Sequence, residues 1–237
     1  MRVVLIVSFA AAVQLTACTQ TVENPTPTTD DEKALYAMGA ILSENLQPFD
    51  LTPAELAFVQ AGLNDGARNE SKVKREEFEA LMPKIQELAE TRQTAALDRE
   101  KAAGAEHLAK VAAEAGAQKT DSGMVYKSVT EGTGESPTAN DSVTVHYEGR
   151  LVNGTVFDSS RERGEPASFP LNGVISCWTE GVQMMKVGGS AQLVCPSELA
   201  YGDQGSPPDM PGGATLTFDV ELLEIVKADV APGAAAE

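Results

Sequence analysis

Residues 145–160 read VHYEGRLVNGTVFDSS, and this stretch decides the fold of the carboxy-terminal half of the chain. From Val143 to Glu148, apolar and polar residues alternate, which is the period-two pattern of a half-buried strand. The dipeptide Asn153-Gly154 that follows is a signal for a tight hairpin turn. The sequence therefore predicts two antiparallel strands joined by this turn.

Two further segments have the pattern of strands. Residues 191–195 alternate between small or apolar and other side chains, and residues 214–225 form a long run rich in Leu, Val, Phe and Thr. Between the predicted strands, residues 178–185 are long enough for only one small helix. We therefore predict an α+β domain, a twisted antiparallel sheet wrapped on a short helix, of about one hundred residues.

Three later blocks accompany the opening stretch. They read GVISCWTEGVQMMKVGG at 173–189, VCPSELAYG at 194–202 and GATLTFDVEL at 213–222. In order and spacing, the four blocks resemble peptidyl-prolyl cis-trans isomerases of the FK506-binding-protein type, and the resemblance covers about the last half of the chain. It implies rotation about X-Pro bonds, in which no covalent bond is made or broken, so that binding the twisted amide better than the planar one is enough.

The resemblance also implies a dry, apolar substrate pocket. Trp178 is expected under the proline ring, the hydroxyl of Tyr201 on a substrate carbonyl, and the backbone N–H of Ile175 on a second carbonyl. Asp158 matches a buried carboxylate beside the pocket, and Arg163 either approaches it or is a solvated loop charge. The positions that match the pocket lining are Tyr147, Phe157, Phe169, Val174, Ile175, Trp178, Tyr201 and Phe218.

The chain departs from the usual pattern of the family at three places. Cys177 stands where glycine is usual before the pocket tryptophan, Ala167 where an aromatic residue is common, and residues 210–212 replace a double proline. These departures bear on ligand affinity more than on fold. An alternative function is therefore a chaperone or peptide-binding module with weak turnover. Cys177 and Cys195 are either a disulfide or two buried thiols.

The amino terminus resembles the leader of a bacterial lipoprotein. A charged start and an apolar run from Val3 to Val13, too short to span a bilayer, predict a signal peptide over 1–17. Residues 15–18, LTAC, resemble a lipoprotein cleavage site and imply lipidation of Cys18, although an ordinary signal-peptidase site is the alternative. Thr19, which is not aspartate, favours the outer membrane over the inner one. Residues 18–31 are predicted to be a flexible tether.

Residues 32–116 are predicted to be helical. A first helix stops before Pro48, and a second begins at Thr52 with a capping box and ends at Gly66. A third runs from about Lys74 to Ala115, with Pro83 as a possible kink. Beyond residue 88 its apolar stripe thins to alanines, so this part is predicted to be a solvated strut.

The two short helices and the long one resemble the amino-terminal region of isomerases of the macrophage-infectivity-potentiator kind. That resemblance implies a homodimer in which the short helices of two chains intertwine and the long helices hold two catalytic domains apart. The alternative is a monomeric helical hairpin, which would bury little surface by itself. The isomerase domain is expected over 121–227, followed by a disordered tail over 228–237.

The composition excludes several classes of function. With 35 acidic against 18 basic side chains and a formal net charge of -17, the chain is unsuited to nucleic acid, whose binding depends on neutralising phosphates. The expected partners are proline-containing unfolded proteins of the bacterial envelope. Two histidines, His107 and His146, and three scattered cysteines do not form a metal-binding pattern, so neither a metal nor a cofactor is predicted.

Overall fold

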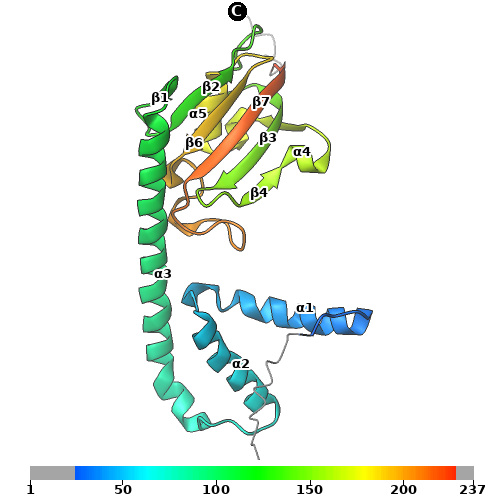
Figure 1. Cartoon of the computed structure of the whole chain (residues 1–237), viewed down its shortest axis with the longest axis vertical. Coiled ribbons are helices and arrows are strands. Elements are labelled where there is room, and N and C mark those ends of the chain that lie inside the picture. Colours follow the sequence, from blue (N-terminus) through cyan, green and yellow to red (C-terminus); the bar gives the residue numbers. More distant parts are fainter. Residues whose placement is uncertain (1–24, 228–237) are drawn as a thin grey trace, which may run out of the picture. The chain divides into compact units, whose positions relative to one another are not determined.

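The computed structural model describes residues 25–227 of the 237-residue chain (Figure 1). The predicted signal peptide, Cys18, most of the predicted tether and the tail lie outside the described residues. Contacts between residues divide the chain into two units, one ending at Ser43 and the other beginning at Glu44. Helix α1 (Asp30–Glu44) makes up nearly all of the described part of the first unit. All of its side chains are exposed.

Helix α2 (Pro53–Ala67) begins where the sequence predicts. The Thr52 hydroxyl accepts a hydrogen bond from the backbone N–H of Glu55, and the Glu55 carboxylate accepts one from the backbone N–H of Thr52 at 2.9 Å. The predicted capping box is therefore confirmed. It satisfies two of the N–H groups that the first turn of a helix leaves without partners. A 3-10 turn, η1 (Gln47–Phe49), precedes this helix.

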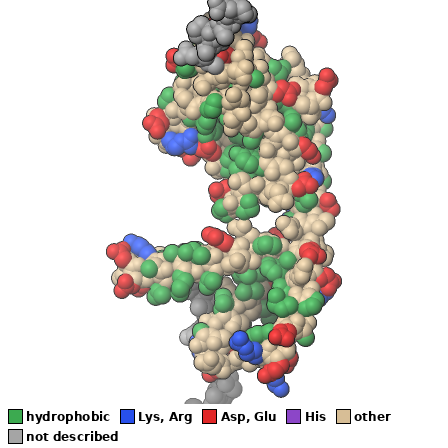
Figure 2. All heavy atoms as spheres, turned by 180° about the vertical axis from the view of Figure 1, so that it is seen from behind, with side chains coloured by type: hydrophobic (Ala, Val, Ile, Leu, Met, Phe, Trp, Pro, Cys, Tyr) green, Lys and Arg blue, Asp and Glu red, His purple; other side chains and the backbone are tan. Residues whose placement is uncertain are grey.

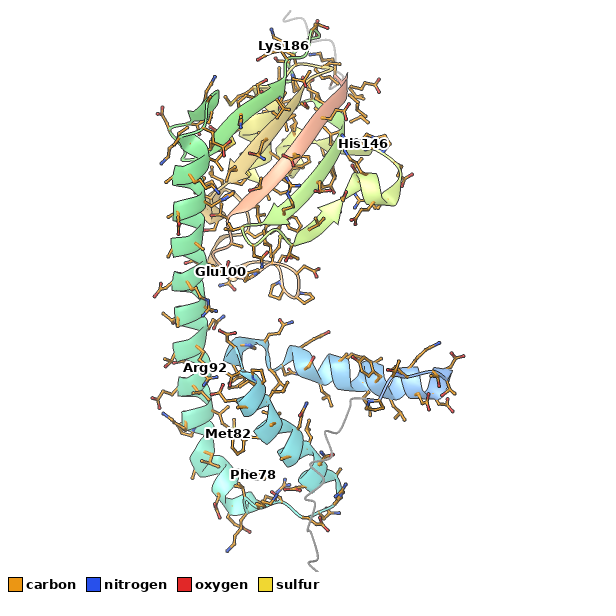
Figure 3. The ribbon with its side chains drawn as sticks, viewed as in Figure 1. Phe78, Met82, Arg92, Glu100, His146 and Lys186 are labelled. Carbon is orange, nitrogen blue, oxygen red and sulfur yellow. A yellow bond between two sulfur atoms is a disulfide. The ribbon has the colours of Figure 1, made fainter. Side chains whose placement is uncertain are left out.

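Helix α3 (Arg75–Ala112) is 38 residues long and continues through Pro83 without interruption. Near its middle, the Arg92 guanidinium pairs with the Glu55 carboxylate at 2.5 Å and donates to the carbonyl of Phe49 at 3.0 Å (Figure 3). The bond from Arg92, assisted by Thr52, lowers the pKa of Glu55 to about 2. One arginine thus joins α3 to both η1 and the start of α2.

The carboxy-terminal domain is a seven-stranded antiparallel sheet in the order β1-β2-β6-β7-β3-β4, with β5 also paired to β3 (Figure 1). The short helix α5 (Ser176–Gln183) packs on its inner face, and one helical turn, α4 (Ser160–Arg163), follows β4. The predicted fold class is confirmed. The strands are β1 (Ala117–Lys119), β2 (Val125–Thr130), β3 (Ser142–Leu151), β4 (Val156–Ser159), β5 (Ala167–Pro170), β6 (Ser190–Cys195) and β7 (Leu216–Val226).

The hairpin between β3 and β4 forms as predicted. Gly154 has a φ of 87°, which suits glycine in a tight turn, and its N–H donates to the carbonyl of Leu151 at 2.9 Å. Along β3 the burial alternates strictly, so Val143, Val145 and Tyr147 face the core. The period-two pattern therefore predicted both the strand and its buried face.

The carboxy-terminal part of α3 is not the solvated strut that the sequence predicts. Val111 is buried against Val125 and Val194 on the outer face of the sheet, with Leu108 beside them. Gly104 lies against Thr215, where a Cβ atom would come within 2.1 Å of the threonine hydroxyl oxygen. The prediction was wrong because small residues allow the helix to approach closely, and the sheet supplies the larger apolar side chains.

Candidate active site

Five aromatic side chains meet on the inner face of the sheet, and we name them the aromatic cluster. Trp178 lies at its centre and contacts three of the other rings edge to face, with centroid distances of 5.1 Å to Tyr147, 5.7 Å to Phe169 and 5.4 Å to Phe218. Phe157 completes the cluster by contacting Phe218 at 5.7 Å. Such edge-to-face pairs stabilise by about 0.5–1.5 kcal/mol each beyond the area they bury. Only 4% of Trp178 remains exposed.

Four strands and one helix contribute these rings. Tyr147 comes from β3, Phe157 from β4, Phe169 from β5, Trp178 from α5 and Phe218 from β7. The sequence-predicted aromatic positions, which span 72 residues from 147 to 218 inclusive, are therefore brought together by the sheet.

Gly149 is a residue of this site that the sequence analysis missed. It pairs with Phe218 across β3 and β7, and a Cβ atom there would lie 2.6 Å from the Phe157 ring and 2.9 Å from the Phe218 ring. The absence of a side chain therefore allows these two rings to meet. The available signal was a glycine inside an otherwise alternating strand, a position that often marks close approach.

A polar network borders the cluster. The Tyr147 hydroxyl donates to one carboxylate oxygen of Asp158, and Arg163 donates to the other. Arg163 also donates to the Tyr147 hydroxyl at 3.0 Å, and its guanidinium lies 5.6 Å from the centroid of that ring. Of the two possibilities for Arg163, the structure thus shows the one in which it approaches Asp158. The Asp158 side chain is 37% exposed, so the expectation of a buried carboxylate was wrong.

Two causes raise the pKa of Tyr147 above its ordinary value. Burial is the larger, and the hydrogen bond to Asp158 is the next. A raised pKa keeps the phenol protonated throughout the neutral range, since an unperturbed tyrosine already titrates near pH ~10. Arg163, which gains partners in Tyr147 and Asp158, has its pKa raised as well. Tyr147 and Arg163 therefore keep their protons near neutral pH, and the hydrogen bonds of the network are suited to orienting the Tyr147 ring.

The remaining predicted residues lie at the margin of the aromatic cluster. Val174 and Ile175 are partly buried against the same core, as is Ala167. Ile175 is the residue before α5, and its carbonyl accepts from the backbone N–H of Trp178 at 2.9 Å. Tyr201 follows β6 and is 42% exposed, and among the described residues its ring contacts none of the five clustered rings. The structure therefore brings together seven of the eight predicted lining residues and leaves Tyr201 free at the surface.

A disulfide joins Cys177 to Cys195, with a Cα–Cα distance of 5.7 Å. Both residues are fully buried. Of the two alternatives that the sequence left open, the structure therefore contains the disulfide and not two free thiols. Since Cys177 immediately precedes Trp178, the bond links the centre of the aromatic cluster to the end of β6.

The opposite face of the sheet carries an open polar hollow that includes Glu148, Asp219 and Glu221. Its carboxylates already have partners, because Arg150 binds both Glu148 and Asp219, and Arg161 binds Glu221 at 2.5 Å. Strand alternation places this hollow away from the aromatic cluster. We therefore assign the candidate site to the cluster.

Residues 25–227 contain neither a metal-binding cluster nor a membrane-spanning helix. No group of three or more His, Cys, Asp or Glu side chains could hold a metal ion. Within the same range, no helix combines the length and apolar character needed to cross a bilayer.

The fold is thus an antiparallel sheet with a short helix and an aromatic cluster on its inner face, preceded in the chain by a helical region. Residues 133–223 match the family model for FKBP-type peptidyl-prolyl cis-trans isomerases, and residues 31–127 match the model for the domain amino terminal to it. The chain belongs to the FKBP-type peptidyl-prolyl cis-trans isomerase family. It is therefore an isomerase of prolyl peptide bonds, as the resemblance implied.

Relatives match over most of the chain or over its carboxy-terminal half. FkpA of Escherichia coli, an FKBP-type peptidyl-prolyl cis-trans isomerase, is 38% identical over 221 residues, which are 88% of this chain and 82% of that protein. The crystal structure of FkpA from the same organism has a TM-score of 0.64 at 37% identity, covering 85% of this chain and 99% of that chain. The isomerase Mip of Coxiella burnetii is 48% identical over 112 residues, 47% of this chain and 49% of that protein.

Proposed function

We propose that the substrate proline binds on the aromatic cluster, with Trp178 under the ring and Phe157, Phe169, Phe218 and Val174 around it. The supporting observation is that three aromatic rings from separate strands contact one buried tryptophan, and that Phe157, from a fourth strand, packs against one of the three. The hydroxyl of Tyr201 and the N–H of Ile175 are the proposed donors to substrate carbonyls. Tyr201 is exposed, and Ile175 stands at the start of a helix, where N–H groups lack intrahelical partners.

The proposed mechanism is preferential binding of the twisted amide. Rotation about the X-Pro bond faces a barrier of about 18–20 kcal/mol from amide resonance. An apolar surface disfavours the planar amide, which has the larger dipole, relative to the twisted one. Asp158 and Arg163 then act by holding Tyr147 in place, and no proton is transferred.

A turnover assay on a prolyl tetrapeptide tests this assignment. Trp178→Leu should abolish most of the activity, and Tyr201→Phe should lower kcat/KM about tenfold, because one hydrogen bond to substrate is lost. Tyr36→Phe on α1, where the side chain is 63% exposed, is the matched control and should change nothing.

The same assay tests the absence of proton transfer. Because the pKa of Tyr147 is raised, kcat/KM should be flat between about pH 6 and 8. A steep bell-shaped profile in that range would contradict the mechanism. A folded protein that binds prolyl peptides without accelerating their isomerisation would instead favour the alternative of a binding module.

We further propose that the protein is a lipoprotein of the bacterial envelope, attached to the outer membrane through Cys18 and acting on unfolded proteins in the periplasm. The support is the leader sequence with its cleavage-site resemblance. Cys18→Ser should prevent lipidation and move the protein out of the membrane fraction. Recovery of that variant in membranes at the unchanged mature mass would contradict the anchor.

The helical region supports the proposal of a homodimer. Side chains that follow helical spacing on α1 stay exposed in the single chain, including 65% of Leu35 and 61% of Ile41, and Figure 2 shows apolar side chains gathered on this helix. An isolated helix of 15 residues has marginal stability in water, so its apolar face is expected to pack against another protein surface. The apolar side chains left exposed are Leu35, Met38, Ile41 and Leu42 on α1, Leu56, Phe58 and Leu63 on α2, and Phe78, Leu81, Met82 and Ile85 on α3.

Light scattering tests the dimer. The full-length Cys18→Ser chain should have the mass of two chains, and a chain that begins after Met82 should have the mass of one and keep turnover of short peptides. On unfolded proteins the shorter chain should be less efficient, since two linked sites raise the effective concentration for a second contact. A monomeric full-length protein would rule out the dimer.

A further inference from the structure

The segment after Tyr201 is an unusual element to carry a substrate contact. Residues 201–213, which we name the Tyr201 loop, read YGDQGSPPDMPGG and contain no strand that pairs with the sheet. Four of the thirteen residues are glycines, the residue type that loses the most conformational freedom on ordering. Inside the loop, backbone bonds join Gly205 to Tyr201 at 3.2 Å and Gly213 to Gly202 at 2.9 Å. Two further backbone bonds join Ser206 and Met210 at 2.9 and 3.0 Å, so contacts from outside the loop add to this internal framework.

Helix α3 contacts this loop directly. The Lys101 ammonium pairs with the Asp203 carboxylate at 2.6 Å, and that hydrogen bond raises the pKa of Lys101. One turn earlier, Leu97 packs against Gly213, where a Cβ atom would lie 2.7 Å from the leucine side chain. Gly213 has a φ of 78°, so its contact with Leu97 depends on a backbone shape that other residues rarely adopt.

The contact continues beyond the loop. Gly104 meets Thr215, the residue before β7, and the His107 ring is 3.0 Å from the hydroxyl of Thr217 in that strand. Leu97, Lys101, Gly104 and His107 follow the three-to-four spacing of one helix face. This face therefore lies against both ends of the Tyr201 loop, at Asp203 and at Gly213, and against the strand that follows it.

We infer that α3 holds the Tyr201 loop in its substrate-binding position, so that Leu97 and Lys101 are positioning residues for the isomerase site although they belong to the helical region. The inference rests on the proposed role of Tyr201. The α3 residues touch no part of the aromatic cluster among the contacts described above, so they act through the loop. The helical region then contributes to substrate affinity within its own chain, apart from any dimer.

The test compares Leu97→Ala/Lys101→Ala with Lys84→Ala in the full chain, because within residues 25–227 the ion pair of Lys84 is with Glu87 on the same helix, at 3.1 Å. The double variant should raise KM for a prolyl tetrapeptide about three- to tenfold with kcat within about twofold, the pattern of a lost binding contribution. Hydrogen exchange should become faster in the Tyr201 loop and stay unchanged in β3. The charge-swapped pair Lys101→Asp/Asp203→Lys should recover most of the affinity that Lys101→Asp alone loses.

A double-mutant cycle with Tyr201→Ala separates this inference from the site assignment. In the Tyr201→Ala background, the effect of Leu97→Ala/Lys101→Ala on KM should fall below about twofold, because the two changes act on one contact. If Tyr201→Ala alone leaves KM unchanged, the proposed role of Tyr201 is wrong. An unchanged KM and unchanged loop exchange in a folded Leu97→Ala/Lys101→Ala variant would overturn the positioning role, as would fully additive effects in the cycle.

Discussion

Trp178→Ala should lower the free energy of unfolding by about 3–5 kcal/mol, the cost of truncating a large buried aromatic side chain. It should also remove nearly all turnover. The reason is geometric, because Trp178 contacts Tyr147, Phe169 and Phe218 at once, and its removal leaves a cavity that three rings border. Equilibrium denaturation by urea, followed by circular dichroism, measures the loss.

Met184→Ala is the matched control for this change, since Met184 caps the same short helix and is 38% exposed. It should cost less than about 1 kcal/mol, as substitutions away from the core usually do. Turnover of Trp178→Ala is then measured at a temperature at which the variant remains folded, so that lost binding is separated from lost structure. A tryptophan variant as stable as the control would show that the cluster is not a packed core.

Removing the disulfide should have the second largest effect. Cys177→Ala/Cys195→Ala opens a covalent link between residues that are 18 apart, and the chain-entropy model assigns a loop of about that length a stabilisation of about 3 kcal/mol. Both cysteines are buried, so loss of their sulfur atoms on substitution by alanine also removes packing. The measurement is urea denaturation of the double variant beside the unchanged protein.

Reduction of the unchanged protein in denaturant is the control for the disulfide. Its midpoint should fall toward that of Cys177→Ala/Cys195→Ala, and the reductant should leave the variant itself unaffected. Turnover should fall as well, because the bond connects the residue before Trp178 to β6. Equal midpoints for the oxidised protein and the double variant would contradict a stabilising role.

Prediction from sequence succeeded where the structure depends on neighbours along the chain. The capping box at Thr52 needs only residues three apart, and the hairpin at Gly154 needs only a turn dipeptide between alternating strands. The aromatic positions were found through a resemblance of ordered blocks, which does not require knowing how the strands pair.

Prediction from sequence failed where a contact depends on the close approach of a helix to the sheet. The face of α3 around Gly104 lacks large side chains, and hydrophobic periodicity therefore predicts that it is exposed to solvent. Strands β2 and β5 were likewise not predicted, because β2 has no regular alternation, β5 has only 4 residues, and their pairing with β6 and β3 is set by the tertiary structure. A chain that begins at Asp121 would accordingly lack β1 and the helix that covers Val125 and Val194.

The buried face of β3 and the cap of α2 were determined by the sequence alone, since these follow from local periodicity and residue type. The set of aromatic residues was implied by the resemblance of the four ordered blocks to the family. The tertiary structure alone decided that Cys177 pairs with Cys195, that Arg163 binds Asp158 and that α3 meets the Tyr201 loop. Each of these depends on the distance between side chains after the sheet has closed. The pair Lys101 and Asp203 lies 102 positions apart, and no pattern along the chain reports such a distance.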